Sequence, residues 1–170
     1  MKMRIPLITV VLLVSLHAPQ TFGQLQPPLV GSTLGQSLRN AAALTYNESA
    51  QMRMFVDHWS GRARSGVYTD LNFQHDYANA LGRFATLRTQ FNYVAELALQ
   101  LGRPRADNAV AELDAGLAKI LELFDFLRDE YNAGTVDRAN LLRATAALQK
   151  ALREWERELR TNGSRLGVLW

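Results

Sequence analysis

The chain has 170 residues, no cysteine, and a formal net charge of +3 that falls to +1 when the two basic residues of its first four positions are set aside. Without cysteine, the chain has no disulfides, no cysteine-ligated zinc and no haem attached through a Cys-x-x-Cys-His motif. The near-neutral balance, with no run of basic residues, argues against nucleic-acid binding.

Residues 1–23 have the pattern of a signal peptide. A basic start is followed by an apolar run at residues 5–16, which suits an export signal and is too short to cross a membrane as a helix. For this reason an uncleaved anchor is the less favoured alternative. Small residues at Thr21 and Gly23 fit a cleavage site, so we expect a mature protein that begins at Gln24. We expect it in the periplasm or outside the cell, with no transmembrane segment in its mature form.

Residues 24–31 contain two adjacent prolines and are predicted to be an extended lead-in. A capping box at Thr33 and Gln36 then predicts the start of a first helix, which ends near residues 60–61. Its expected packing positions are spaced three and four apart: Leu34, Leu38, Ala41, Thr45, Glu48, Met52, Phe55 and Trp59. The polar residues 47–49 leave open a helix broken into two pieces.

Three further helices are predicted, each ended by a glycine. The second begins at Thr69 or Asp70 and ends at Gly102, with packing positions Phe73, Tyr77, Leu81, Phe84, Arg88, Phe91, Ala95, Ala98 and Leu101. The third begins near residues 104–107 and ends at 132–134, with Val110, Leu113, Leu117, Ile120, Phe124, Leu127 and Tyr131. The fourth begins at residues 135–137 and ends near 162–163, with Leu141, Thr145, Leu148, Leu152, Trp155 and Leu159.

The short connections between these helices favour antiparallel neighbours. Residues 32–163 are therefore predicted to be one all-α domain, an antiparallel up-down-up-down four-helix bundle. Residues 164–170 form an apolar C-terminal tail that ends at Trp170. We expect the tail to fold back over the bundle end, because exposed Trp and Leu promote aggregation. The alternative is a projecting peptide that a partner recognises.

Polar residues at packing positions form one candidate site. Antiparallel packing would bring Glu48, Arg88 and Thr145 to one level of the bundle. A carboxylate and a guanidinium at that depth predict either a pocket for a small polar ligand or a purely structural arrangement. In the structural arrangement, the two side chains form a pair that fixes the register of the helices, or they lean out to the helix flank. We favour the structural arrangement.

Metal and catalytic sites have weaker support in the sequence. Met54 and His58 lie four residues apart on one predicted helix face and are the only weak candidates for a metal site, since copper and haem iron accept such ligands. His75 is expected to be solvated. The Glu-x-x-His pairs of dimetal bundles, and the common motifs of hydrolases and phosphate-binding loops, are missing from the sequence. We therefore predict no enzyme activity and no cofactor.

The sequence favours a non-catalytic interaction or structural module with a protein partner. The expected contacts are Arg62, Arg64 and Tyr68 in the first connection, and Trp170 in the tail. The alternative function is a small-ligand or metal carrier, for copper or haem, that uses Glu48 and Arg88 or Met54 and His58. A third interpretation is self-association into a homo-oligomer through an apolar stripe of Leu121, Leu123 and Phe126.

Overall fold

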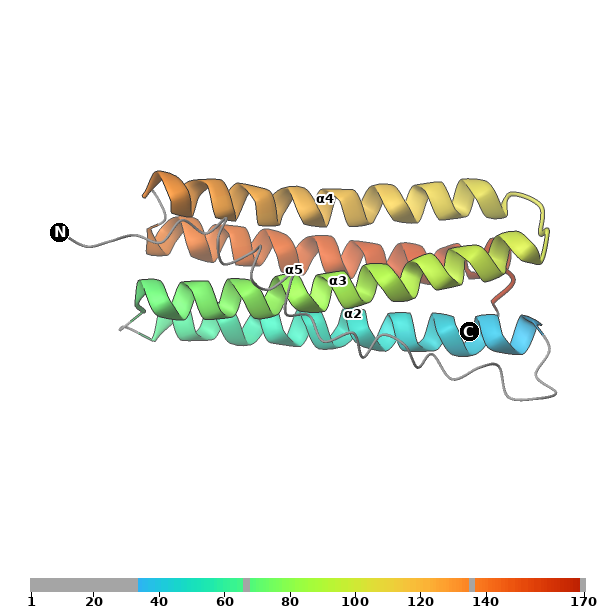
Figure 1. Ribbon diagram of the computed structural model, residues 1–170, viewed down its shortest axis with the longest axis horizontal. Helices are drawn as coiled ribbons and strands as arrows, with labels where there is room; N and C mark the ends of the chain where they lie inside the picture. The colour runs from blue at the N-terminus through green and yellow to red at the C-terminus, as the bar shows by residue number, and fades with distance from the viewer. Residues whose placement is uncertain (1–33, 66–67, 135–136, 169–170) are drawn as a thin grey trace.

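The computed structural model describes residues 34–65, 68–134 and 137–168, and in these the chain is all-helical. Four long helices run side by side in alternating directions (Figure 1): α2 (Leu34–Arg64), α3 (Asp70–Gln100), α4 (Ala106–Ala133) and α5 (Arg138–Thr161). A short helix, α6 (Gly163–Leu166), follows α5. The predicted all-α fold with four long helices packed together is confirmed. The predicted signal peptide and the lead-in at 24–31 lie outside the described residues.

Local capping explains three of the helix ends. Thr69 caps α3 by accepting the Asn72 backbone N–H at 3.2 Å, and Asp137 caps α5 by accepting that of Asn140 at 2.6 Å. Gly134 ends α4 in the left-handed region, at φ 71°. Helix α2 is unbroken through residues 47–49 and continues to Arg64, beyond the predicted end at 60–61.

The bundle consists of two layers of two helices each. In Figure 1, α3 and α4 lie toward the viewer, while α2 and α5 lie behind them. Helix α2 lies close to both α3 and α5, because small residues occupy much of its buried face: Ala41, Ala42, Thr45, Ser49, Ser60 and Ala63. Between α3 and α4, aromatic rings hold the helices farther apart. Phe73 stacks on Tyr131 at 4.6 Å between ring centroids, and Phe124 contacts Tyr77 at 5.9 Å.

The buried faces of α4 and α5 include most of the predicted packing positions, but those of α2 and α3 are displaced by one residue at several points. In α2, Ser49 and Val56 are buried in place of the predicted Glu48 and Phe55. In α3, the buried residues are Ala80, Leu87 and Val94, where the sequence predicted Leu81, Arg88 and Ala95. Glu48 and Arg88 therefore lie beside the buried face and not within it, which contradicts a buried layer and agrees with the alternative in which they lean out to the helix flank.

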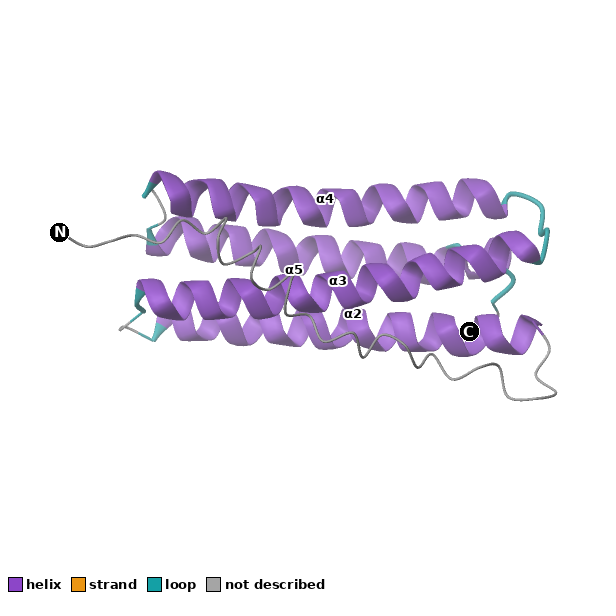
Figure 2. Cartoon of the chain, viewed as in Figure 1, coloured by secondary structure: helices purple, strands orange, loops and turns teal. Residues whose placement is uncertain are grey.

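The carboxyl tail folds back onto the bundle as far as residue 168. Leu166 and Val168 are buried, and α6 contacts α3, α4 and α5. Arg165 also pairs with Glu112 of α4, at 3.1 Å. Trp170 lies outside the described residues. Figure 2 shows that short loops at the two ends of the bundle connect the helices. Among the described residues, every helix falls short of the combined length and apolarity that a membrane span requires.

Candidate functional site

One end of the bundle carries the α2–α3 connection beside the α4–α5 connection. We call this region the loop end and define it by residues 59–76 of the first pair of helices and residues 131–141 of the second, within the described ranges. It contains the predicted contact residues Arg62, Arg64 and Tyr68. Two hollows open there, and both are lined by Tyr68.

A hydrogen-bond network fixes the position of Tyr68. The Tyr68 hydroxyl donates to Asp76 Oδ2 at 3.0 Å and accepts a bond from Trp59 Nε1 at 2.5 Å. The Asp76 carboxylate is buried and also accepts two bonds from Arg62, with Nε at 3.2 Å from Oδ2. A buried carboxylate needs such partners, since it has lost its water. The network therefore ties the connection to both α2 and α3.

The network extends the pH range over which Tyr68 stays protonated. Burial raises the pKa of Tyr68 above its ordinary value, and the nearby Asp76 carboxylate raises it further. A tyrosine is already neutral near pH 7, so the shift keeps Tyr68 a hydrogen-bond donor into the alkaline range.

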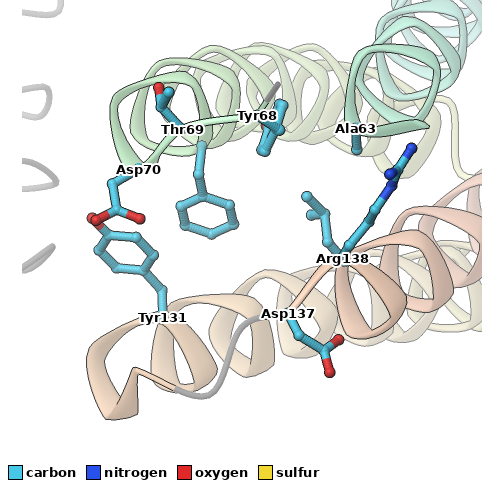
Figure 3. Close-up of a pocket in the computed structure, with 9 residues that line it drawn as sticks. Ala63, Tyr68, Thr69, Asp70, Tyr131, Asp137 and Arg138 are labelled. Atoms are coloured by element: carbon cyan, nitrogen blue, oxygen red, sulfur yellow. The ribbon is translucent and has the colours of Figure 1, made fainter. Parts of the chain in front are cut away.

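The first hollow has a volume of about 160 Å³ and lies between the start of α3 and the α4–α5 connection (Figure 3). Its described lining mixes apolar, acidic and basic side chains: Ala63, Tyr68, Thr69, Asp70, Phe73, Tyr131, Asp137, Arg138 and Leu141. Two of these groups already have bonds within the chain, because Asp137 caps α5 and Tyr131 accepts a bond from Gln74 at 2.7 Å. Among the described lining residues, no nucleophile is hydrogen-bonded to a base, and the hollow mixes apolar walls with a few polar groups, as sites for small ligands do.

The second hollow is broader, at about 470 Å³, and lies on the outer side of α3. Its lining is Arg62, Ser65, Tyr68, Leu71, Asn72, His75 and Asp76. Leu71 is 73% exposed, the highest value among the large apolar side chains described. Sequence reasoning missed Leu71 because it lies off the periodic positions. It also missed Asp76, although the spacing of Asp76 from Phe73 and Ala80 could have placed it on the buried face.

The predicted polar layer does not form. Glu48 pairs with Arg83 at 3.6 Å, and Arg88 pairs with Asp114 at 3.5 Å. Thr145 is buried as predicted, but its hydroxyl donates to the Leu141 carbonyl of its own helix at 3.0 Å. The structure therefore separates these three residues, because Glu48 and Arg88 each lie one position away from the buried face.

A different polar layer joins α2 to α5. Glu156 is only 7% exposed. Its Oε1 accepts bonds from Ser49 Oγ at 3.1 Å and Arg53 Nε at 3.3 Å. These contacts satisfy the carboxylate within the bundle and fix the register of the two helices.

The weak metal candidates are both on the surface. Met54 is 67% exposed, and His58 is exposed as well. Across the described residues, no cluster of three or more His, Cys, Asp or Glu side chains is arranged to hold a metal ion. His75 is exposed, as expected, and its ring lies 3.0 Å from Asn79 Nδ2.

The remaining predicted contacts have different environments. Arg62 is held by Asp76, whereas Arg64 is exposed at the last turn of α2. The predicted apolar stripe on α4 is interrupted, because Leu121 and Leu123 are partly buried against the core and only Phe126, at 49%, is largely exposed.

No protein-family model, no curated protein and no solved structure matches this chain. The geometry of the loop end is therefore the basis for assigning a function.

Proposed function

We propose that the protein is an exported, non-catalytic interaction module that binds a protein partner through its loop end. One observation carries this proposal: the strongly exposed Leu71 lies at a hollow of about 470 Å³ whose wall is fixed by buried hydrogen bonds of Tyr68 and Asp76. Leu71 shares this hollow with Tyr68 and Arg62, and aromatic residues and arginine are enriched at protein interfaces.

The composition of the loop end supports a protein partner. Arginine and tyrosine are among the residue types that dominate binding energy at interfaces, and Arg62 and Tyr68 lie here beside the exposed Leu71. Arg64 adds an exposed charge nearby. Because the network holds Tyr68 in place before binding, little conformational entropy remains to be lost when a partner docks.

The buried polar groups support a non-catalytic module. Three buried polar side chains, Asp76, Thr145 and Glu156, each form hydrogen bonds within the bundle. These bonds compensate for the water that each group has lost, so a structural role accounts for them. The exported location is proposed from the sequence of residues 1–23. Mass spectrometry of the protein purified from its own source tests whether residues 1–23 are cleaved. We expect an amino terminus at Gln24, and a chain that still begins at Met1 would contradict a cleaved signal peptide.

A site-specific crosslinking experiment tests the loop end. A photoreactive amino acid replaces Leu71 in the organism that makes the protein, and the matched control carries it at Leu44, an α2 side chain that is 54% exposed. Leu44 lies about 27 Å along α2 from Arg62, at 1.5 Å per residue. We expect one discrete protein adduct from position 71 and none from position 44. Equal adducts from both positions, or none from either, would contradict the proposal.

Carriage of a small ligand is a second candidate function, favoured by the hollow of about 160 Å³ between Phe73, Tyr131 and Leu141. Native mass spectrometry of the gently purified protein separates the two functions. A bound small molecule that is lost in a Leu141→Trp variant would support carriage, because the larger side chain fills the hollow. A bare chain would favour the interaction module.

A further inference from the structure

The two layers of the bundle carry opposite charge. The α3–α4 layer has ten acidic and four basic side chains, while the α2–α5 layer has ten basic and five acidic. The near-zero charge of the whole domain therefore conceals two faces of opposite sign. In Figure 1 the acidic layer faces the viewer and the basic layer lies behind it.

On each layer the charges form a row along one helix. The acidic row on α4 consists of Asp107, Asp114, Glu122, Asp125 and Asp129, and all but the half-buried Asp125 are exposed. The basic row on α5 consists of Arg143, Lys150, Arg153, Arg157 and Arg160, all exposed. At 1.5 Å per residue, the acidic row spans about 33 Å and the basic row about 26 Å. The two rows are therefore opposite in charge and similar in length.

Part of each row is left without an ion pair inside the chain. Arg128 pairs with Asp125 and Asp129, and Lys150 lies 3.8 Å from Glu154. Within the described part of the chain, no ion pair engages the acidic Asp107 and Glu122 or the basic Arg153 and Arg157. These four charges are exposed and are therefore open to a second molecule.

We propose that copies of this chain associate through these rows, with the acidic row of one copy against the basic row of the next. The evidence for a second copy as the occupant is charge complementarity within one sequence, in rows of similar length. The rows lie on different sides of the bundle. Asp114 of the acidic row contacts Arg88 of α3, while Arg160 of the basic row lies over the Tyr46 ring of α2, at 4.4 Å. Two unlike surfaces make a heterologous contact, which repeats from copy to copy.

Sedimentation velocity of the purified protein tests this association. We expect the mean sedimentation coefficient to rise with protein concentration at about 20 mM salt and to fall to the monomer value at about 500 mM, because salt screens exposed charges. Neutral variants then test each row. Arg153→Gln with Arg157→Gln changes the basic row, and Asp107→Asn with Glu122→Gln changes the acidic row. Each double variant should weaken association about tenfold.

The decisive measurement mixes the two double variants. Each keeps one intact row, so an equimolar mixture should form a one-to-one dimer and no larger species. A control that neutralises Arg39, an exposed residue of α2 outside both rows and the loop end, should associate like the unmodified chain. The proposal is overturned if the unmodified protein is monomeric at low salt, in which case the rows serve a partner of different sequence. It is also overturned if the association is insensitive to salt, or if neither double variant weakens it. The test does not involve Leu71, so its failure would leave the proposed loop-end function standing.

Discussion

Gly116 lies in the middle of α4 beneath the indole of Trp155, and we predict that Gly116→Ala destabilises the protein. Alanine normally stabilises a helix interior by about 1 kcal/mol relative to glycine. Here its Cβ would lie 2.7 Å from Trp155 Cδ1. The indole has little room to move, because it is buried, packs edge-on against Phe91 at 5.8 Å, and donates to the Leu113 carbonyl at 2.9 Å.

The opposing terms decide the sign of the effect. Overpacking costs about 1–3 kcal/mol, and weakening the indole hydrogen bond costs about 1 kcal/mol more. Together they outweigh the gain in helix propensity, so we expect a net loss of about 2 kcal/mol in the free energy of unfolding. Urea denaturation followed by circular dichroism measures this, with the slope of the transition unchanged.

Gly82 of α3 provides the matched control. A Cβ at this position would meet no heavy atom within 4 Å, so Gly82→Ala should stabilise the protein by up to about 1 kcal/mol. The same substitution is thus expected to have opposite signs at two mid-helix sites. If Gly116→Ala stabilised the protein as much as Gly82→Ala, the close packing of Trp155 over Gly116 would be refuted.

Three further changes probe the interior. Burial raises the pKa of Tyr77 to about 12, so the folded state retains a proton that the unfolded state loses above about pH 10. Stability should therefore fall as pH rises from about 10 to about 12, and urea titrations of Tyr77→Phe should show a smaller fall. Glu156→Gln removes the charge that faces Arg53, and urea denaturation should show a loss of about 1 kcal/mol in the free energy of unfolding. Glu156→Ala should lose more stability, because no acceptor remains for the Ser49 hydroxyl. Equal losses from the two variants would contradict a specific role for that acceptor. Leu166→Ala should cost about 2 kcal/mol and speed amide exchange in α6, whereas unchanged exchange would show that the tail does not depend on this anchor.

The fold was predictable because its signals are local and repeated. Thr69 before α3 and Gly134 after α4 marked helix ends that the structure confirms. The sequence placed Asp137 in the first turn of the fourth helix, and the structure makes it the N-cap of α5. The exact buried face was harder to predict. A straight α-helix has 3.6 residues per turn, so a strict alternation of three and four drifts by about 20° in each heptad. Over the 31 residues of α2, that drift moves burial from Glu48 to Ser49 and from Phe55 to Val56.

The choice of larger side chains as packing positions was the other source of error. Leu81 was chosen as a packing position instead of the smaller Ala80. Seven residues further along, the same periodic pattern then placed Arg88 in the predicted core instead of Leu87. The candidate polar layer required both Glu48 and Arg88 on the buried face. Because neither residue lies there, the layer does not form. The actual layer, between Ser49 and Glu156, has only a weak signature in the sequence. Glu156 follows the buried Leu152 by four residues, but acidic residues at 154 and 158 are typical of a solvated helix face.

Tyr68 links the stability of the loop end to the proposed binding. Its hydroxyl is the bond partner of the buried Trp59 indole N–H and also a donor to Asp76. Tyr68→Phe leaves that indole group without this partner, which costs about 1–3 kcal/mol, while Arg62 still holds Asp76.

The bundle should therefore stay folded while the α2–α3 connection loses order. Tyr46→Phe, at an aromatic residue beside Arg160 and outside the loop end, is the control. If binding depends on a preordered surface, Tyr68→Phe should speed amide exchange near Leu71 and lower the crosslinking yield there, and Tyr46→Phe should do neither. Faster exchange with an undiminished crosslink would show that the partner orders the connection itself, and preorganisation would then have no part in the binding.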